Sequence, residues 1–137
     1  MTRPGHFLAN HVKYGGIGHS VKILLFSKNS ARQTKVLVVG YAIKDRFGQV
    51  IFGTNTHHLS GAVESVVAGE MIEYAFQFPA NFGVGTYSVA VAAHRDEVHI
   101  GANYEWRDLA TIFNVISGSE SQFVGSAWIP PALEVTR

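Results

Sequence analysis

The sequence predicts an all-β domain built as a two-sheet antiparallel sandwich of the immunoglobulin-like or jelly-roll type. The chain has 137 residues, the size of one ordinary domain. It contains 14 glycines and 9 phenylalanines but few long amphipathic stretches, which favours strands over helices. Roughly seven or eight short apolar segments alternate with loops at the spacing typical of a sandwich. We therefore expect residues 1–137 to form a single β-sandwich domain.

The first half of the chain contains three expected strands. Residues 20–27 form the first, and residues 35–44 form a second that is rich in β-branched side chains. Residues 45–48 predict a tight turn in which Gly48 supplies the positive φ that a β-carbon resists. Residues 50–53 then return as the second strand of a hairpin.

Two later segments alternate between large and small side chains. In residues 70–78 the large positions are Ile72, Tyr74, Phe76 and Phe78. In residues 87–95 they are Tyr87, Val89, Val91 and Ala93. Because successive side chains of a strand point to opposite faces, we expect these two large faces to meet in the core. The segment between them, residues 79–85, is a glycine-rich loop.

The last third of the chain mixes two periodicities. Apolar residues at the spacing i, i+3, i+4 and i+7 from Trp106 to Phe113 indicate a helical stripe. Residues 112–116 are strongly β-prone, so we expect one helical turn leading into a strand at 111–117. A final strand is expected at 122–129, and Pro130-Pro131 should end its pairing because proline has no N–H to donate.

Composition excludes several functions. Eleven basic and ten acidic residues leave a net charge of +1, which is too balanced for nucleic-acid binding driven by phosphate neutralisation. The chain has no cysteine, so disulfides, thiolate metal sites and a cysteine nucleophile are excluded. No apolar run reaches the ~18 residues of a membrane span, and the N-terminus does not resemble a signal peptide. We expect contact with a membrane only through a partner protein.

Catalytic and metal-binding patterns are weak. His94 and His99 flank a turn with Asp96 and Glu97, where a His/carboxylate metal site is conceivable, but solvated turn residues explain the same pattern. The adjacent residues His57-His58 would point to opposite faces of a strand. No carboxylate pair, G-x-S-x-G elbow or phosphate loop stands out by its spacing. We predict no enzyme activity and no cofactor for this chain.

Two features are suited to a sugar ligand. A sheet face built from Ala42, Ala75, Ala90 and Ala92 would leave room for a flat or chain-like molecule, although alanine also simply tolerates an outer face. Residues 103–108 combine aromatic and planar polar side chains, which suit the apolar face and the hydroxyls of a sugar ring. The alternative for this segment is a core tryptophan flanked by solvated charges.

Several motifs, taken in order along the chain, resemble the C-terminal carbohydrate-binding domain of Wzt proteins. Those proteins are the ATP-binding subunits of ABC transporters that export bacterial O-antigen polysaccharide. The resemblance runs from about Val38 to Val135, and before Val38 the sequence departs from the family's pattern. The matching residues are 40–45 with Gly48, 52–56, 68–70, 82–89, 92–94, Trp106, Asp108 and 113–115.

The resemblance implies a sandwich domain that forms a homodimer and binds the non-reducing end of a finished O-polysaccharide. It implies a cytoplasmic location, peripheral to the inner membrane as part of a transporter. It also suggests that the chain is a fragment of a longer transporter subunit, with the ATPase domain elsewhere. A late segment at 122–135 could pair across subunits.

We predict a carbohydrate site on the small-residue sheet face together with the tryptophan segment. Trp106 would stack on a sugar ring, and the polar residues would bond its hydroxyls. Two other functions stay open: a protein-binding β-sandwich adaptor and a small glycan-active enzyme. The predicted site residues are Lys44, Glu73, Gln77, Ser88, His94, Trp106 and Asn114.

Overall fold

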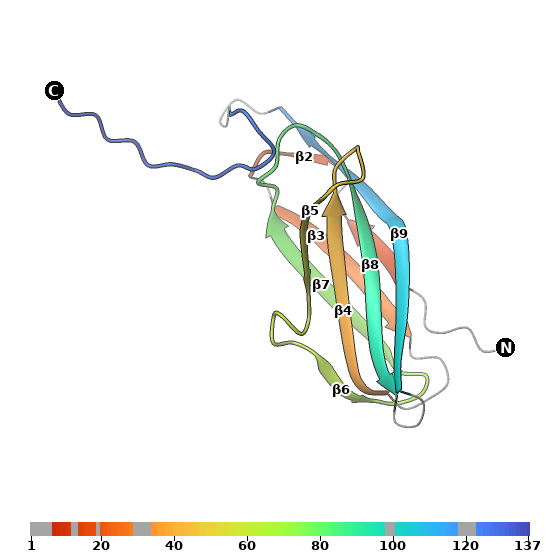
Figure 1. Ribbon diagram of the computed structural model, residues 1–137. Helices are drawn as coiled ribbons and strands as arrows, with labels where there is room; N and C mark the ends of the chain where they lie inside the picture. The colour runs from red at the N-terminus through yellow and green to blue at the C-terminus, as the bar shows by residue number, and fades with distance from the viewer. Residues whose placement is uncertain (1–6, 12–13, 19, 29–33, 98–100, 118–122) are drawn as a thin grey trace.

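The computed structural model describes residues 7–11, 14–18, 20–28, 34–97, 101–117 and 123–137. Within these ranges the chain forms nine strands and no helix, arranged as two sheets packed face to face (Figure 1). No helix in these ranges is long and apolar enough to cross a membrane. The predicted all-β sandwich is confirmed.

The two sheets differ in size, and all their pairings are antiparallel except the β2–β9 pair. The smaller sheet has the order β1 (Phe7–His11), β3 (Ser20–Lys28), β7 (Met71–Pro79). The larger sheet has the order β2 (Tyr14–Gly16), β9 (Gly101–Ile116), β8 (Gly85–Glu97), β4 (Thr34–Lys44), β5 (Val50–Asn55), with β6 (Val63–Val66) also paired to β4.

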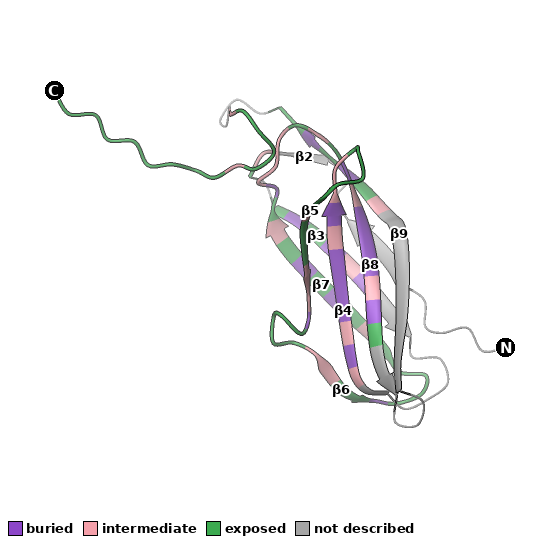
Figure 2. Cartoon of the chain, viewed as in Figure 1, coloured by how far each residue is buried: buried purple, intermediate pink, exposed green. Residues whose placement is uncertain are grey.

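The core lies between the sheets and is built by alternation along the strands. Buried and less buried residues alternate along much of β4 and β8 (Figure 2), except at residues 39–41 and 89–91, where three buried residues follow one another. Tyr41 of the larger sheet packs on Phe76 and Phe78 of the smaller one, with ring centroids 4.8 Å and 5.6 Å away. The expectation that the large faces of 70–78 and 87–95 meet in the core is confirmed, because side chains of both belong to one buried cluster.

Two local hydrogen-bonding arrangements shape the chain, and the first of them lies in a turn that was predicted from the sequence. In the β4–β5 turn, Asp45 Oδ1 accepts the N–H groups of Phe47 and Gln49, each at 2.9 Å, and Gly48 has φ +80° as predicted. At the start of β8, the hydroxyl of Tyr87 donates to the carbonyl of Gly83 at 2.5 Å. A tyrosine that bonds back to the preceding loop is the corner device of immunoglobulin-like sandwiches.

The expected helical turn near Trp106 is wrong. Gly101–Ile116 is a continuous strand, and its register against β8 shifts. Val89 stands opposite Thr111 while Val91 stands opposite Arg107, so a step of two residues in β8 matches a step of four in β9. Such a bulge interrupts the period of two, and the interrupted apolar pattern resembled a helical stripe.

The expected strand at 122–129 is also wrong for its described residues, 123–129. They form only an isolated bridge, Phe82 with Ala127, made by Gly83 N–H to Ser126 O at 3.0 Å and Trp128 N–H to Asn81 O at 2.8 Å. Beyond the bridge, residues 129–137 are exposed and extend away from the body (Figure 1). Strands β1, β2 and β6 were not predicted.

Candidate functional site

On the outer face of the larger sheet, several neighbouring residues have very small side chains or none. Gly40 stands opposite Ala92 of β8 and Asn55 of β5, and Ala42 stands opposite Ala90 and Gly53. The β4 neighbours of Gly40 and Ala42 point into the core, so these two residues and their strand partners face outward, although Gly40 is buried and Ala90 is only 1% exposed. We call this surface the small-residue floor; its members are Gly40, Ala42, Gly53, Ala90 and Ala92.

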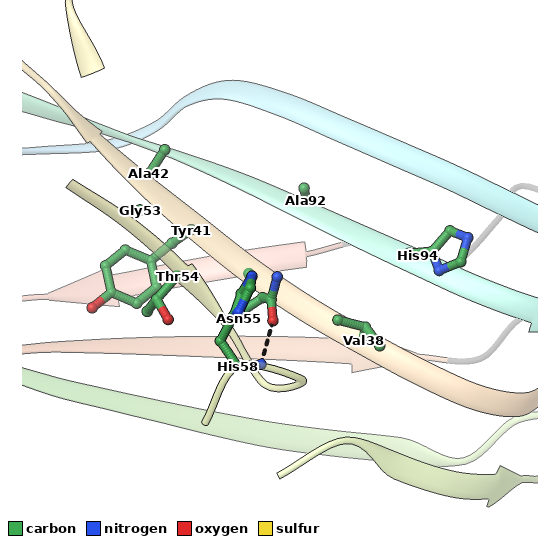
Figure 3. Close-up of a pocket in the computed structure, with 10 residues that line it drawn as sticks. Val38, Tyr41, Ala42, Gly53, Thr54, Asn55, His58, Ala92 and His94 are labelled. Carbon is green, nitrogen blue, oxygen red and sulfur yellow. Dashed lines mark hydrogen bonds between the residues drawn. The ribbon is translucent and has the colours of Figure 1, made fainter. Parts of the chain in front are cut away.

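A pocket of about 240 Å³ lies over part of this floor (Figure 3). Its polar lining comes from Thr54, Asn55, His58 and His94. In the described part of the chain, no carboxylate, lysine or arginine lines this pocket. The apolar remainder of the lining consists of Val38, Gly40, Tyr41, Ala42, Gly53 and Ala92.

The turn that follows β5 places His58 at this pocket. Asn55 Oδ1 accepts the backbone N–H of His58 at 2.7 Å (Figure 3). Thr56, which follows Asn55 in the chain, is buried and holds the turn to β4. Its Oγ1 accepts Val39 N–H at 3.0 Å, and its own N–H donates to Val39 O at 2.8 Å. The turn is therefore closed by Asn55 and anchored to β4 by Thr56.

Glycine at position 40 is required by the close approach of β5. A β-carbon there would lie 2.8 Å from Asn55 Cβ and 2.8 Å from the carbonyl oxygen of Thr54. Real β-carbons do not approach other heavy atoms so closely, so a side chain at 40 would push Asn55 and the pocket edge away.

Four of the predicted site residues share this outer face. Lys44 pairs with Ser88 beside the β4–β5 turn, and Thr86 Oγ1 donates to Asn114 Oδ1 at 2.7 Å in the neighbouring strand pair. His94 lines the pocket. It lies six residues along β8 from Ser88, roughly 20 Å for an extended strand. The face is thus long enough for a short oligosaccharide.

The structure does not bring Glu73 and Gln77 to the same face. Both lie on β7 with exposed side chains, and Gln77 Nε2 donates to Ser20 Oγ of β3 at 2.7 Å. Ala75, which we grouped with the other alanines, is exposed between them on the same strand. Because β7 belongs to the smaller sheet, these three residues face outward on the side of the sandwich opposite to the pocket. The single-face grouping is therefore corrected.

Trp106 lies on β9, where its Cα stands opposite that of Ala92, at the register of the small-residue floor. Its side chain lies outside the described residues. The other tryptophan, Trp128, is in the C-terminal segment and packs on Phe123 with ring centroids 5.2 Å apart.

Histidines and carboxylates do not assemble a metal centre in the described part of the chain. No three His, Asp or Glu side chains there are placed to hold an ion. His57 and His58 lie in the turn 56–60 rather than in a strand, with ring centroids 6.0 Å apart. His99 lies outside the described residues.

Sequence reasoning missed three polar residues of this pocket, Thr54, Asn55 and His58. From the sequence we interpreted Asn55 as a turn-shaping residue of the family motif rather than as a ligand, and we did not place His58 at a site. The available signal was local. The side chain of an asparagine at the end of a strand accepts backbone N–H groups of the turn that follows it. Here it accepts the N–H of the residue three positions later, His58.

Comparison with known proteins identifies relatives of this chain. A family model described as the Wzt C-terminal domain matches residues 12–129. A search of curated protein sequences gave no match.

Solved structures share its fold, and two of them are compared with it. The crystal structure of the C-terminal domain of Wzt is 16% identical, with a TM-score of 0.73 over 98% of this chain and 93% of that one. The crystal structure of a protein assigned as ApaA from Bordetella pertussis is 11% identical, with a TM-score of 0.55 over 82% of this chain and 96% of that one.

Proposed function

This chain belongs to the Wzt C-terminal domain family, and we propose that it binds the non-reducing end of an O-antigen polysaccharide on the outer face of its larger sheet. The family ties the chain to the ATP-binding subunit of an O-antigen transporter. The domain would act as the substrate-recognition module of that exporter, without catalysis of its own, on the cytoplasmic side of the inner membrane.

The small-residue floor and its pocket are the observation that supports this proposal. Sheet faces usually project side chains of mixed size, whereas here the side chains of Gly40, Ala42, Gly53 and Ala92 leave an open, concave surface. Sugar rings need such a shallow apolar surface with a few polar groups around it. Thr54, His58 and His94 supply those polar groups at the pocket, and Asn55 holds the backbone of His58 in place.

The glycan would extend from the pocket along β8 toward the β4–β5 turn. In this proposal His94 contacts the terminal sugar, and Lys44, Ser88 and Asn114 bond hydroxyls of the sugars behind it. Trp106 is kept as a stacking residue because its Cα is opposite that of Ala92. Glu73 and Gln77 are left out of the site because they lie on the other sheet.

The test is a titration with O-polysaccharide of the source strain, intact and stripped of its terminal residue, followed by tryptophan fluorescence. We expect saturable binding of the intact polysaccharide only. Ala92→Leu fills the pocket and should weaken binding at least about tenfold. Ala75→Leu makes the same change on the outer face of the smaller sheet and should leave binding unchanged. Equal effects of the two substitutions would refute the assignment of the face.

A protein-binding adaptor is the second candidate function. In the described residues β5 ends the larger sheet, and apolar residues gather at its hairpin: Phe47 is 77% exposed, Val50 54% and Phe52 45%. An exposed edge with apolar side chains can accept a partner strand. Failure of the intact polysaccharide to bind the folded chain would favour this function.

We also propose a homodimer. The extended segment 129–137 is exposed, and Ile129, Leu133 and Val135 are 79%, 85% and 76% exposed. Apolar residues of this kind are usually covered by another surface. Sedimentation analysis should give a dimer for the whole chain and a monomer for a chain lacking residues 131–137. A dimer that survives the deletion would mean that this segment is not its contact.

A further inference from the structure

We propose that the pocket on the small-residue floor accepts an uncharged sugar ring, that His58 is a specificity-determining contact, and that Asn55 is the residue that positions it. This inference rests on the proposed function and specifies the substrate class that the pocket selects. It involves two residues that the family resemblance did not assign to binding.

The charge of the pocket indicates an uncharged ligand. A carboxylate or phosphate that loses its water in a pocket needs a cationic partner to offset the cost. Among the ten described residues that line the pocket, none is lysine, arginine, aspartate or glutamate. Lys44, a cation on this face, stands opposite Ser88, beyond the Val38–Ala42 stretch of β4 that borders the pocket.

The size of the pocket indicates a single ring. Its volume of about 240 Å³ is below the range of roughly 300–1,000 Å³ that is usual for drug-sized ligands. The floor leaves no side chain longer than a methyl group beneath the ligand. One sugar ring therefore fits with its apolar face on the floor and its hydroxyls toward the polar edge.

The position of His58 depends on Asn55. The bond from His58 N–H to Asn55 Oδ1 at 2.7 Å closes the turn on itself, and Gly40 lets Asn55 come close enough to β4 to line the pocket too. His57 occupies the same turn and is exposed, but it does not line the pocket. The two neighbouring histidines therefore form a matched pair for experiment.

The first experiment is a double-mutant cycle measured by calorimetric titration of the whole chain with O-polysaccharide of the source strain. His58→Ala should weaken binding about tenfold, as expected for the loss of a hydrogen bond and its contact area, and His58→Gln should recover part of it. Asn55→Ala should weaken binding to a similar extent. If Asn55 acts through His58, the double variant binds no more weakly than His58→Ala alone.

His57→Ala is the control and should bind like the unchanged chain. Thermal unfolding of each variant separates a binding effect from a folding effect. Additive losses in the double variant would overturn the positioning role of Asn55. An unchanged affinity for His58→Ala would overturn the role of His58.

The second experiment tests the charge of the ligand at about pH 8. We expect the dissociation constant to change less than about twofold when NaCl is raised from about 50 to about 500 mM. Methyl glycosides of neutral hexoses or 6-deoxyhexoses should compete with the polysaccharide, and methyl hexuronides should not. Competition by hexuronides alone, or steep weakening by salt, would overturn the uncharged ligand.

The two proposals fail in different ways. If the unchanged chain does not bind the polysaccharide, the proposed function is refuted, and this inference is refuted with it. If the unchanged chain binds and Ala92→Leu does not, while His58→Ala binds normally, the face is correct and only the inference is overturned.

Discussion

At the scale of single residues, the site depends on where the chain lacks a side chain. Gly40 and Gly53 lie on neighbouring strands of one face, yet their surroundings differ. A β-carbon at 40 would meet Asn55 and the backbone of Thr54 at 2.8 Å, whereas one at 53 would meet its nearest neighbour, the oxygen of Tyr41, at an ordinary 3.5 Å. Neither has a positive φ, so the difference is one of space alone.

Gly40→Ala should therefore destabilise the protein, and Gly53→Ala should not. Overpacking against backbone costs about 1–3 kcal/mol, while an alanine that fits a strand changes stability by a few tenths to about 1 kcal/mol in the favourable direction. Urea unfolding followed by circular dichroism gives both values. Equal free energies of unfolding for the two variants would show that β5 can move away from β4 at little cost.

At the scale of elements, few backbone bonds among the described residues attach the C-terminal segment to the body. Two backbone bonds join it to the loop before β8, and Gly83 faces Gly125, where a β-carbon at 83 would lie 2.8 Å from the carbonyl oxygen of Gly125. The sequence 122–129 has the composition of a strand, but a strand needs a partner over several residues. Its described part finds one only at a single bridge.

Gly83→Ala should detach this segment while the sheets stay intact. We expect hydrogen exchange of the Trp128 amide, which donates to Asn81 O, to become at least about tenfold faster. The amide of Val39, bonded to Thr56 within the larger sheet, should keep its rate. Gly61→Ala serves as the control because its β-carbon would meet its nearest atom at 3.8 Å. An unchanged exchange rate of the Trp128 amide would mean that the segment shifts to accept the added methyl group without detaching from the loop before β8.

At the scale of the whole molecule, an aromatic core holds the two sheets together. Tyr41 and Tyr87 both belong to it, and both come from the larger sheet. Burial raises the pKa of Tyr41 above its usual value near 10. Burial also raises the pKa of Tyr87, with a further contribution from the negative charge of Asp45. Both hydroxyls are therefore harder to ionise in the folded protein than in the unfolded chain.

This difference predicts a loss of stability at alkaline pH. Below about pH 10 both states keep these protons and the stability is fully present; as pH rises above 10 the unfolded chain releases them first, so the free energy of unfolding falls. Urea unfolding between about pH 8 and pH 11 measures the slope. Tyr87→Phe should lower stability at pH 8 through loss of the bond to Gly83, about 0.5–1.5 kcal/mol, and should flatten the slope. An unchanged slope would contradict a raised pKa for Tyr87.

Much of the architecture could be predicted because it is local. Alternation in 70–78 and 87–95 identified the buried face of β7 and β8, and the Asp45–Gly48 turn followed from side-chain and glycine chemistry. The interrupted alternation of β9 was misleading, because a bulge two residues wide imitates a helical period when no partner strand is considered. The turn at 56–60 was also missed, since its anchor is Val39, a residue 17 positions earlier in the chain.

The sequence by itself determined which side of each well-patterned strand faces the core, the hairpin turn and the family to which the chain belongs. Only the tertiary structure decided on which sheet an outward residue lies. Ala42, Ala75 and Ala92 look alike along the chain, yet Ala75 faces the opposite side of the sandwich. The physical reason is that side-chain alternation is a property of one strand, whereas the order of strands in a sheet depends on hydrogen bonds between segments far apart in sequence.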